Sequence, residues 1–299
     1  MIHIRAYKGY NIEYDEDRKK FFGQKGNETL DGYEREEGLS DSIDRHEEEI
    51  AEMLRKAQAE NVMKELGDVV FTITAPDLLY YCTVLKAYLN EATAHISSTQ
   101  LWSCGLDPAN VVLVKVGIPL TCNKPNLAEF RVGLGLTQLY TLVSNTQAKQ
   151  FKLRFNTAEN TCTISDGFGS FTMHTVDPYD KPAKVPELDY TNSAKMDASV
   201  FRKFITYADR VAESVFFIAK DNQMHFEAEG DLNKYVSPPF GQVYLTEKKA
   251  DSKSKFSIEY LLKLRFTGLL TIELRTDYPL RLTDEQGNIL VLAPRVAEE

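Results

Sequence analysis

Apolar and polar residues recur in the same order twice along most of the chain. The stretch TAPDLLYYCTVLKAYLNEA has helical periodicity and resembles DASVFRKFITYADRVAESV about 120 positions later; LGLTQLYTLVSNT resembles FSIEYLLKLRFTG at nearly the same offset. Each helical stretch is followed by alternating or continuous apolar residues that are typical of strands. The pattern predicts four copies of a helix followed by strands, which indicates an internal duplication.

Prolines mark the boundary between the two copies. The intervening segment, TVDPYDKPAKVPELDY, contains three prolines that keep the backbone extended and outside any helix. We predict an N-terminal extension at residues 1–68, a first domain at 69–174, a connector at 175–190 and a second domain at 191–299. The fold class is α+β, in which each domain carries its helices on one face of antiparallel sheets.

The front segment follows a different pattern. Two strand-like stretches flank the turn-forming DEDR, and a polar loop with Gly26, Gly32 and Gly38 comes next. An amphipathic helix is then expected over residues 41–66, before Gly67. Its apolar stripe contains Ile43, Ile50, Leu54 and Ala57. The segment therefore predicts a hairpin and a helix, a piece too small to build much core alone.

The helix expected from Asp197 to Ala212 separates an apolar face from a basic one. At ~100° per residue, Lys203 and Arg210 point almost opposite the apolar side chains, and Arg202 lies on the flank. The apolar face is formed by Phe201, Phe204, Ile205, Ala208 and Ala212. Exposed bases of this kind either contact a polyanion or simply keep a surface soluble, and the pattern alone leaves both readings open.

The other expected helices carry fewer bases on their outer faces. The last helix turns Lys263 outward, whereas the first turns Tyr80 outward and has only Lys86 near its edge. The second helix of the first domain has no charge on its outer face, which consists of Gln138, Thr141 and Asn145. Any polyanion is thus expected to be held mainly by the second domain.

The composition is ordinary for a folded protein, with 43% hydrophobic and 26% charged residues. No apolar run reaches the ~20 residues that a bilayer span needs, and the first residues lack the apolar core of a signal peptide. The net charge of −9 argues against general affinity for polyanions. Residues 1–68 hold 11 basic and 18 acidic side chains, so the acidity belongs mainly to the front segment.

The sequence lacks the motifs of common enzyme sites. GFGS is not a nucleophile elbow, VGLGLT lacks the third glycine of a dinucleotide loop, and no Gly-Lys-Ser/Thr follows a glycine-rich run. The cysteines show no C-x-x-C spacing and the histidines are isolated from one another. We therefore expect buried reduced thiols, no metal, no cofactor and no enzyme activity.

Several segments of the chain, taken in their order, carry a resemblance. The connector with VPELDY, the stretches LNEATAHIS, GLDPANVVLV and AEGDL, and the terminal DYPLRL and LAPRVAEE together resemble proliferating cell nuclear antigen (PCNA), the DNA sliding clamp of archaea and eukaryotes. The likeness covers residues 69–299. It implies a clamp fold and a ring, usually a trimer, whose helices surround duplex DNA and whose sheets form the rim.

The resemblance also implies two sets of site residues. The DNA-facing set contains Lys86, Arg202, Lys203, Arg210 and Lys263. The second set frames an outer apolar groove for short partner peptides and contains Leu106, Val111, Leu113, Val185, Pro186, Pro279, Leu292, Ala293 and Pro294. An exposed apolar pocket is the physical form of a partner site, although each of these residues could instead complete a core.

The partners implied by the resemblance are those of a replication factor. They are double-stranded DNA bound without sequence preference, DNA polymerase, a clamp loader, and other replication and repair enzymes that carry clamp-binding peptides. The expected state is a homotrimer with no membrane contact. The expected location is the cytoplasm of an archaeal or virus-like source, or the nucleus of a eukaryote.

Three features depart from the family pattern. Residues 1–68 precede the family's usual start and are either an accessory domain or a solvated appendage. The first domain lacks the outward lysines that clamps usually have at Tyr80, Thr141 and Ser144. The edge strands that close the ring are expected near 170–177 and 234–239, where Pro238 and Pro239 would shorten the contact. A rival reading is therefore a clamp chain that works only in a hetero-assembly, or a monomeric decoy for clamp-binding peptides.

Overall fold

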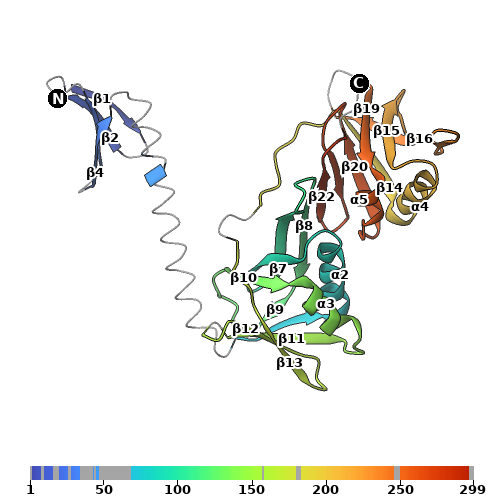
Figure 1. The fold of residues 1–299 in the computed structure, drawn as a ribbon. Coiled ribbons are helices and arrows are strands. Elements are labelled where there is room, and N and C mark those ends of the chain that lie inside the picture. Colours follow the sequence, from blue (N-terminus) through green and yellow to red (C-terminus); the bar gives the residue numbers. More distant parts are fainter. Residues whose placement is uncertain are drawn as a thin grey trace. The chain divides into compact units, whose positions relative to one another are not determined.

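A computed structural model describes residues 2–7, 10–15, 20–25, 28–33, 43, 45, 46, 69–156, 158–179, 183–245 and 250–295 (Figure 1). The chain divides into two compact units, Met1–Val62 and Met63–Glu299. Each unit has its own sheets, and the second contains all of the repeated pattern. The four segments predicted from the sequence stay a prediction.

The first unit contains a four-stranded antiparallel sheet in the order β1-β2-β3-β4. Its strands are β1 (Ile2–Tyr7), β2 (Tyr10–Asp15), β3 (Lys20–Lys25) and β4 (Glu28–Tyr33). The hairpin expected around DEDR is present as the antiparallel pair β2–β3, but the prediction missed two strands, because one apolar stretch is both β1 and β2 and the supposed polar loop around Gly32 is β4. Of the expected helix, the structure describes Ile43, Arg45 and His46, which are helical; its other residues lie outside the described part of the chain.

The second unit repeats one motif, a strand followed by a helix and further strands, four times. The helices are α2 (Ala75–Lys86), α3 (Leu136–Ser144), α4 (Ala198–Asp209) and α5 (Ile258–Leu262). We call residues 69–174 the first half and residues 191–295 the second half. The duplication predicted from the sequence is confirmed, since α4 follows α2 and α5 follows α3 at almost one offset.

The strands of the two halves correspond in order. The first half contains β5 (Phe71–Thr74), β6 (Glu91–Ile96), β7 (Gln100–Leu106), β8 (Val112–Pro119), β9 (Thr121–Cys122), β10 (Phe130–Gly135), β11 (Gln150–Asn156), β12 (Thr161–Ser165) and β13 (Ser170–His174). The second half contains β14 (Asn192–Asp197), β15 (Ser214–Lys220), β16 (Gln223–Glu229), β17 (Lys234–Val236), β18 (Phe240–Tyr244), β19 (Ser252–Ser257), β20 (Leu269–Leu274), β21 (Leu280–Thr283) and β22 (Ile289–Leu292).

Local sequence explains where the two longer helices begin. Thr74 caps α2, because its hydroxyl accepts a hydrogen bond from the Asp77 amide at 3.2 Å, and Pro76 suits the first turn. Asp197 caps α4 in the same way through the Ser199 amide at 2.7 Å. Helix α4 ends at Asp209, three residues earlier than expected, with Arg210 as its C-cap.

The two halves share one large sheet. Its thirteen strands run in the order β10-β6-β7-β8-β22-β21-β20-β14-β18-β16-β15-β19, with β17 on β16, while β13-β12-β11-β5-β9 form a second sheet. The junction between the halves is the antiparallel pair β8–β22, which we call the seam. At the seam, Leu290 and Leu292 are 1% and 0% exposed. The apolar run near the end of the chain thus completes the core between the halves.

The helices lie together on one side of the large sheet, and the connector runs along the other (Figure 1). The core lies between the helices and the sheet, where Leu78, Leu85, Phe201 and Ile205 are fully buried. Among the described helices, none is long and apolar enough to cross a membrane. We call the side of the sheet opposite the helices the outer face, and the connector lies along it.

Candidate partner and DNA interfaces

Strand alternation sends every second residue of the seam to the outer face. There, Cys104 of β7, Leu113 of β8 and Val291 of β22 form a buried apolar cluster. Partly buried side chains pack against it from the sheet and from the connector: Trp102, Ala183, Val185, Leu188 and Ile289. The connector therefore lies on an apolar patch that spans both halves.

Most of the residues predicted to frame the peptide groove surround this patch. Leu106 is 44% exposed and Pro186 is exposed, whereas Leu113 lies inside the cluster at 8%. The half-buried members are Val111, Val185, Pro279, Ala293 and Pro294. Leu292 is wrong as a groove residue, because it faces the helix side and is fully buried; the outward residues of that strand are Ile289 and Val291.

A tight turn between β7 and β8 holds one wall of this region. The Asp107 carboxylate accepts hydrogen bonds from the amides of Ala109, Val111 and Val112 at 3.2, 2.7 and 2.6 Å. The Ala293 amide then donates to the Val111 carbonyl at 2.9 Å. The turn of the first half and the C-terminal segment of the second half are thereby fixed side by side, which gives the groove its two walls.

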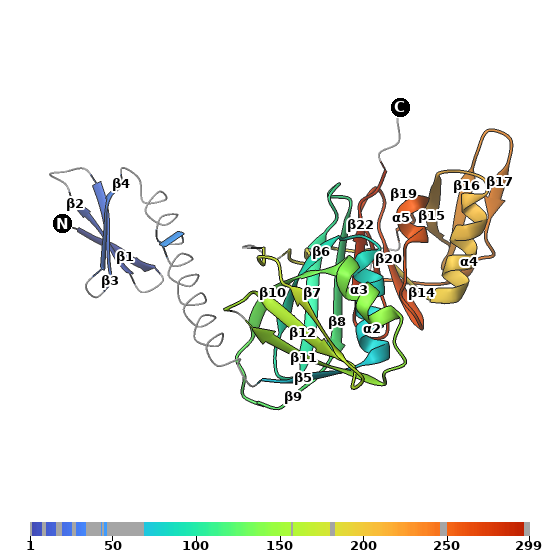
Figure 2. The ribbon, with the colours of Figure 1, turned by 60° about the horizontal axis from the view of Figure 1, so that its bottom comes forward.

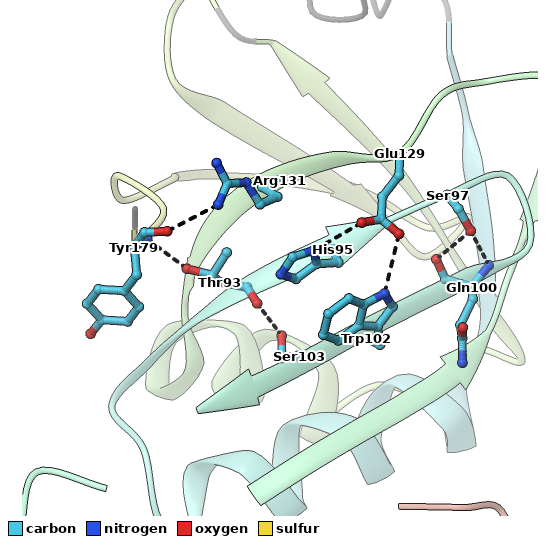
Figure 3. Close-up of polar contacts among 9 residues, drawn as sticks. All are labelled: Thr93, His95, Ser97, Gln100, Trp102, Ser103, Glu129, Arg131 and Tyr179. Atoms are coloured by element: carbon cyan, nitrogen blue, oxygen red, sulfur yellow. Dashed lines mark hydrogen bonds and ion pairs between the residues drawn. The ribbon is translucent and has the colours of Figure 1, made fainter. Parts of the chain in front are cut away.

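Polar contacts anchor the start of the connector (Figure 3). The Tyr179 amide donates to the Thr93 hydroxyl at 2.8 Å, and the Arg131 guanidinium donates to the Tyr179 carbonyl at 3.4 Å. A cavity of about 630 Å³ opens beside this anchor, between the connector residues Tyr179 and Ala183 and the strand end at Leu106. A cavity of this size is large enough to take side chains of a bound peptide.

An aromatic pair on the outer face was not anticipated from the sequence. The His95 imidazole stacks on the Trp102 indole with 3.8 Å between ring centroids, and Glu129 accepts hydrogen bonds from both, at 3.1 Å from Nδ1 and 3.5 Å from Nε1 (Figure 3). Burial lowers the pKa of His95, although the Glu129 contact opposes the shift. The only sequence signal was the chain's single tryptophan at an outward strand position.

The bases predicted to face DNA have unequal surroundings. Lys203 and Arg210 are exposed, as the helical wheel predicts. Arg202 is half-buried instead, and its guanidinium donates to the Phe266 carbonyl at 2.6 Å, so it also ties α4 to the segment after α5. Lys263 forms an ion pair with Glu259 at 2.8 Å, which weakens its attraction for a phosphate.

The outer positions of α2 and α3 contain few charges. The Lys86 amine lies 4.5 Å above the Tyr140 ring. Thr141 and Asn145 are exposed, which confirms the neutral outer face predicted for α3. The two halves therefore offer different electrostatics on one scaffold.

Tyr80 does not point into solvent as the helical wheel predicts. Its hydroxyl donates to the Asp284 carboxylate at 2.6 Å, across the seam in the turn between β21 and β22. Asn288 supports the same carboxylate at 2.9 Å, and burial and the neighbouring Asp284 raise the pKa of Tyr80, so that the phenol stays a donor. A wheel cannot show this contact because the acceptor lies 204 positions away.

Strands β13 and β17 lie at opposite ends of this unit, and in the described part of the chain each pairs on one side only (Figures 1 and 2). Both ends expose apolar side chains. At β13 these are Phe168 and Phe171, which are 90% and 45% exposed, and at β17 they are Leu232 and Val236, which are 94% and 49% exposed. Pro238 and Pro239 come just after β17, separated from it by Ser237, as predicted. Apolar edges of this kind suit pairing with another chain.

The described residues hold no group of three or more His, Cys, Asp or Glu side chains that could bind a metal ion. The described cysteines are all free thiols, and burial raises the pKa of Cys82 and Cys162 to about 12, so these thiols stay protonated.

Known proteins resemble this chain over most of its length. The DNA polymerase sliding clamp of Archaeoglobus fulgidus is 29% identical over 246 residues, which make up 78% of this chain and 97% of the relative. The DNA polymerase sliding clamp of Methanothrix thermoacetophila is 28% identical over 227 residues, 72% of this chain and 93% of the relative. No protein-family model matches the chain.

A solved structure shows that the fold, like the sequence, is similar to that of a sliding clamp. The structure of A. fulgidus PCNA bound to the C-terminal region of FEN-1 matches with a TM-score of 0.66 and 27% identity, over 77% of this chain and 100% of that one. The duplicated halves, the shared sheet and the connector are therefore features of a known architecture. The chain is a homologue of the archaeal DNA polymerase sliding clamps, the PCNA proteins, and has their fold.

Proposed function

We propose that this chain is a sliding clamp: a ring of three copies that encircles duplex DNA and tethers replication and repair enzymes to it. The observation that carries the proposal is the sheet shared by two duplicated halves, together with two strands that pair on one side only within the described residues: β17 in that sheet and β13 at the end of the five-stranded sheet. A contact between unlike edges is head-to-tail, and it closes into a ring when the rotation between copies permits.

Tethering requires a surface for partner peptides, and the outer face supports one. The Cys104, Leu113 and Val291 cluster, the connector and the Val111–Ala293 contact form an apolar region with defined walls. The relative from A. fulgidus was solved with the C-terminal region of FEN-1 bound to it. We infer that this region takes a short peptide with a hydrophobic plug.

Sliding requires weak contact with DNA, because a closed ring is retained by topology and not by affinity. The exposed Arg210 at the C-cap of α4, together with Lys263, supplies a few phosphate contacts that orient the duplex without sequence preference. The protein performs no chemistry in this role, so no metal, cofactor or catalytic residue takes part. Its place is with the replication machinery, in the cytoplasm or in a eukaryotic nucleus.

Light scattering and retention on circular DNA test the proposal together. The purified chain is expected to have the mass of three copies and, once loaded by a clamp loader on nicked circular DNA, to stay bound until the DNA is linearised. Release on linearisation separates encirclement from ordinary binding. A chain that leaves circular and linear DNA at the same rate is not a sliding clamp.

One observation favours a second candidate, a chain that works only with other clamp chains or as a monomeric decoy. Strand β17 has three residues and is followed by two prolines, which cannot donate to a sheet, so the contact between copies is short. A single-copy mass over a wide concentration range, with intact peptide binding, would support this candidate. For residues 1–68, the choice between accessory domain and appendage stays open to a deletion test of loading and peptide binding.

A further inference from the structure

The helices and paired strands of the two halves correspond, so that positions within these elements have counterparts, although the offset changes from one element to another. The caps Thr74 and Asp197 are 123 positions apart, and the register of the β6–β7 hairpin recurs in β15–β16 at the same offset. Strand β17 follows β16 as β8 follows β7, and β13 follows β12 as β22 follows β21. The free edges β13 and β17 are therefore the counterparts of the two strands that meet at the seam.

The seam then serves as a template for the junction between copies. Within the chain, Leu290 of β22 lies opposite Val114 of β8. Their counterparts are Phe171 of β13 and Tyr235 of β17, as the pairings on the neighbouring strands show. This register places two aromatic rings opposite each other, where the seam has two aliphatic core residues.

The same correspondence applies to the polar contact beside the seam. Tyr80 of α2 has Lys203 of α4 as its counterpart, 123 positions later. Asp284 follows β21 directly, as Asp166 follows β12 directly. The hydrogen bond from Tyr80 to Asp284 therefore has a potential equivalent between Lys203 of one copy and Asp166 of the next.

Asp166 has the same local setting as Asp284. One oxygen, Oδ1, accepts from the amides of Phe168 and Gly169 at 2.9 Å each, just as Asp284 Oδ1 accepts from two amides of its own turn. The other oxygen, Oδ2, has a single contact, with the Thr146 hydroxyl at 3.2 Å. A carboxylate oxygen can accept a further hydrogen bond, so Oδ2 has room for an ammonium donor.

The surroundings of both groups suit such a contact. Asp166, Phe168 and Phe171 line an open cavity of about 440 Å³ beside α3, at the β13 edge. Lys203 is exposed, and no carboxylate within the described residues lies within ion-pair distance of it. Beside it, Tyr207 of α4 contacts Tyr235 of β17 with 5.9 Å between rings, so α4 and the β17 edge form one surface.

We propose that Lys203 of each copy forms an ion pair with Asp166 of the next copy, beside a β13–β17 pair in which Phe171 faces Tyr235. The inference rests on the proposed ring and adds the residues that close it. It moves Lys203 from the DNA-facing set to the junction and leaves Arg210 as the main exposed base of α4. A charge-assisted bond here would partly offset the shortness of β17.

A double-mutant cycle on the full chain tests the ion pair. Lys203→Met and Asp166→Asn each remove one charge, and Asn keeps an oxygen for the Phe168 and Gly169 amides, so that the turn is preserved. Each variant is expected to raise the concentration at which half of the rings dissociate by about three- to tenfold. The double variant is expected to be no weaker than the worse single variant, because the two changes remove one shared contact.

Lys152→Met, an exposed lysine on β11, is the matched control and should leave dissociation unchanged. Effects that add independently in the double variant, or no effect in either single variant, overturn the ion pair while the ring stands. A wild-type chain that is monomeric at every concentration overturns the ring itself. Thermal unfolding of each variant separates loss of assembly from loss of folding.

Cross-linking tests the register without relying on charge. The seam pair Val291 and Leu113 has Thr172 and Lys234 as its counterparts. A Thr172→Cys and Lys234→Cys chain should therefore form disulfide-linked trimers on oxidation, since opposite positions on paired strands lie within disulfide range. Phe171→Cys with Lys234→Cys shifts the pair by one residue and should cross-link far more slowly. Equal rates for the two pairs would contradict the proposed register.

Discussion

The two halves of the second unit have the same scaffold but different outer helix surfaces. The exposed or C-cap bases Lys203, Arg210 and Lys263 have Tyr80, Ala87 and Thr141 as their counterparts. The caps, the buried stripes and the strand order are kept in both halves. The features that specify the fold are thus kept in both halves. The outer helix positions differ: in the first half Tyr80 contacts Asp284 across the seam, whereas in the second half these positions carry basic side chains.

The largest expected effect is at the seam, where the two halves share a core. Leu290→Ala removes a fully buried side chain between them and is expected to lower the free energy of unfolding by about 2–5 kcal/mol. Its counterpart Phe171 is half exposed, so Phe171→Ala should change unfolding of the single chain by less than about 1 kcal/mol and weaken assembly instead. Urea unfolding and light scattering measure the two effects. Equal losses of stability would refute the distinction between an internal seam and an open edge.

The next effect concerns charge on the two halves. Arg210→Glu is expected to shorten the lifetime of loaded rings on circular DNA by roughly three- to tenfold and to lower the salt dependence of binding. Thr141→Lys, which places a base at the counterpart of Lys263, should raise that salt dependence by about one unit of slope. Lys152→Glu on β11 controls for net charge. If Thr141→Lys has no effect, the first half does not face the DNA.

A smaller effect is expected at Tyr80. Tyr80→Phe removes the donor to Asp284 and leaves a buried carboxylate with one partner fewer, which should lower the free energy of unfolding by about 1 kcal/mol. Tyr140→Phe provides the comparison: Tyr140 is a half-buried tyrosine of α3 whose ring contacts Lys86, and the change should lower the free energy of unfolding by less. Denaturant midpoints measure the change in the free energy of unfolding for both variants. A larger decrease for Tyr140→Phe than for Tyr80→Phe would contradict a stabilising Tyr80–Asp284 hydrogen bond.

The smallest effect is the pH dependence from His95. Burial lowers its pKa in the folded chain, so below the ordinary value of about 6.5 the unfolded chain binds more protons. The stability is therefore fully present above about pH 6.5 and falls as the pH drops below it. His95→Gln should flatten this slope. Fluorescence of Trp102, the chain's single tryptophan, reports the transition.

His225 provides the matched control in the second half, because it is the counterpart of Trp102 in the β15–β16 hairpin. His225→Gln removes a histidine from the strand position that corresponds to Trp102, and it leaves the His95 site unchanged. If it flattens the pH dependence as much as His95→Gln, the slope does not come from the stacked pair.

Periodicity predicted the helices well and the outward direction of some residues poorly. The four helices have a clear apolar stripe, so their positions and the faces of Lys203 and Thr141 followed from the sequence. The run Ile289 to Leu292 is apolar at every position, so alternation could not show which residues face outward; only pairing with β8 shows that they are Ile289 and Val291. Tyr80 was misjudged because its partner lies across the seam, beyond any local pattern.

The first unit shows the same limit for short strands. Its sequence has no long alternating run, so β1 and β2 were read as one stretch and β4 as a loop. A residue such as Gly32 is usual in loops and weakens the strand pattern. The His95–Trp102 pair was missed for a different reason, since stacking depends on the register between β6 and β7.

The position of β22 in the sheet also determines the order in which the protein is completed. Its partner β8 is synthesised some 170 residues earlier, and until the last strand leaves the ribosome the edge of β8 is unpaired. The nascent first half is therefore exposed to wrong pairing for most of synthesis. Loss of even the last dozen residues would leave that edge open for good, so a truncated chain is expected to aggregate.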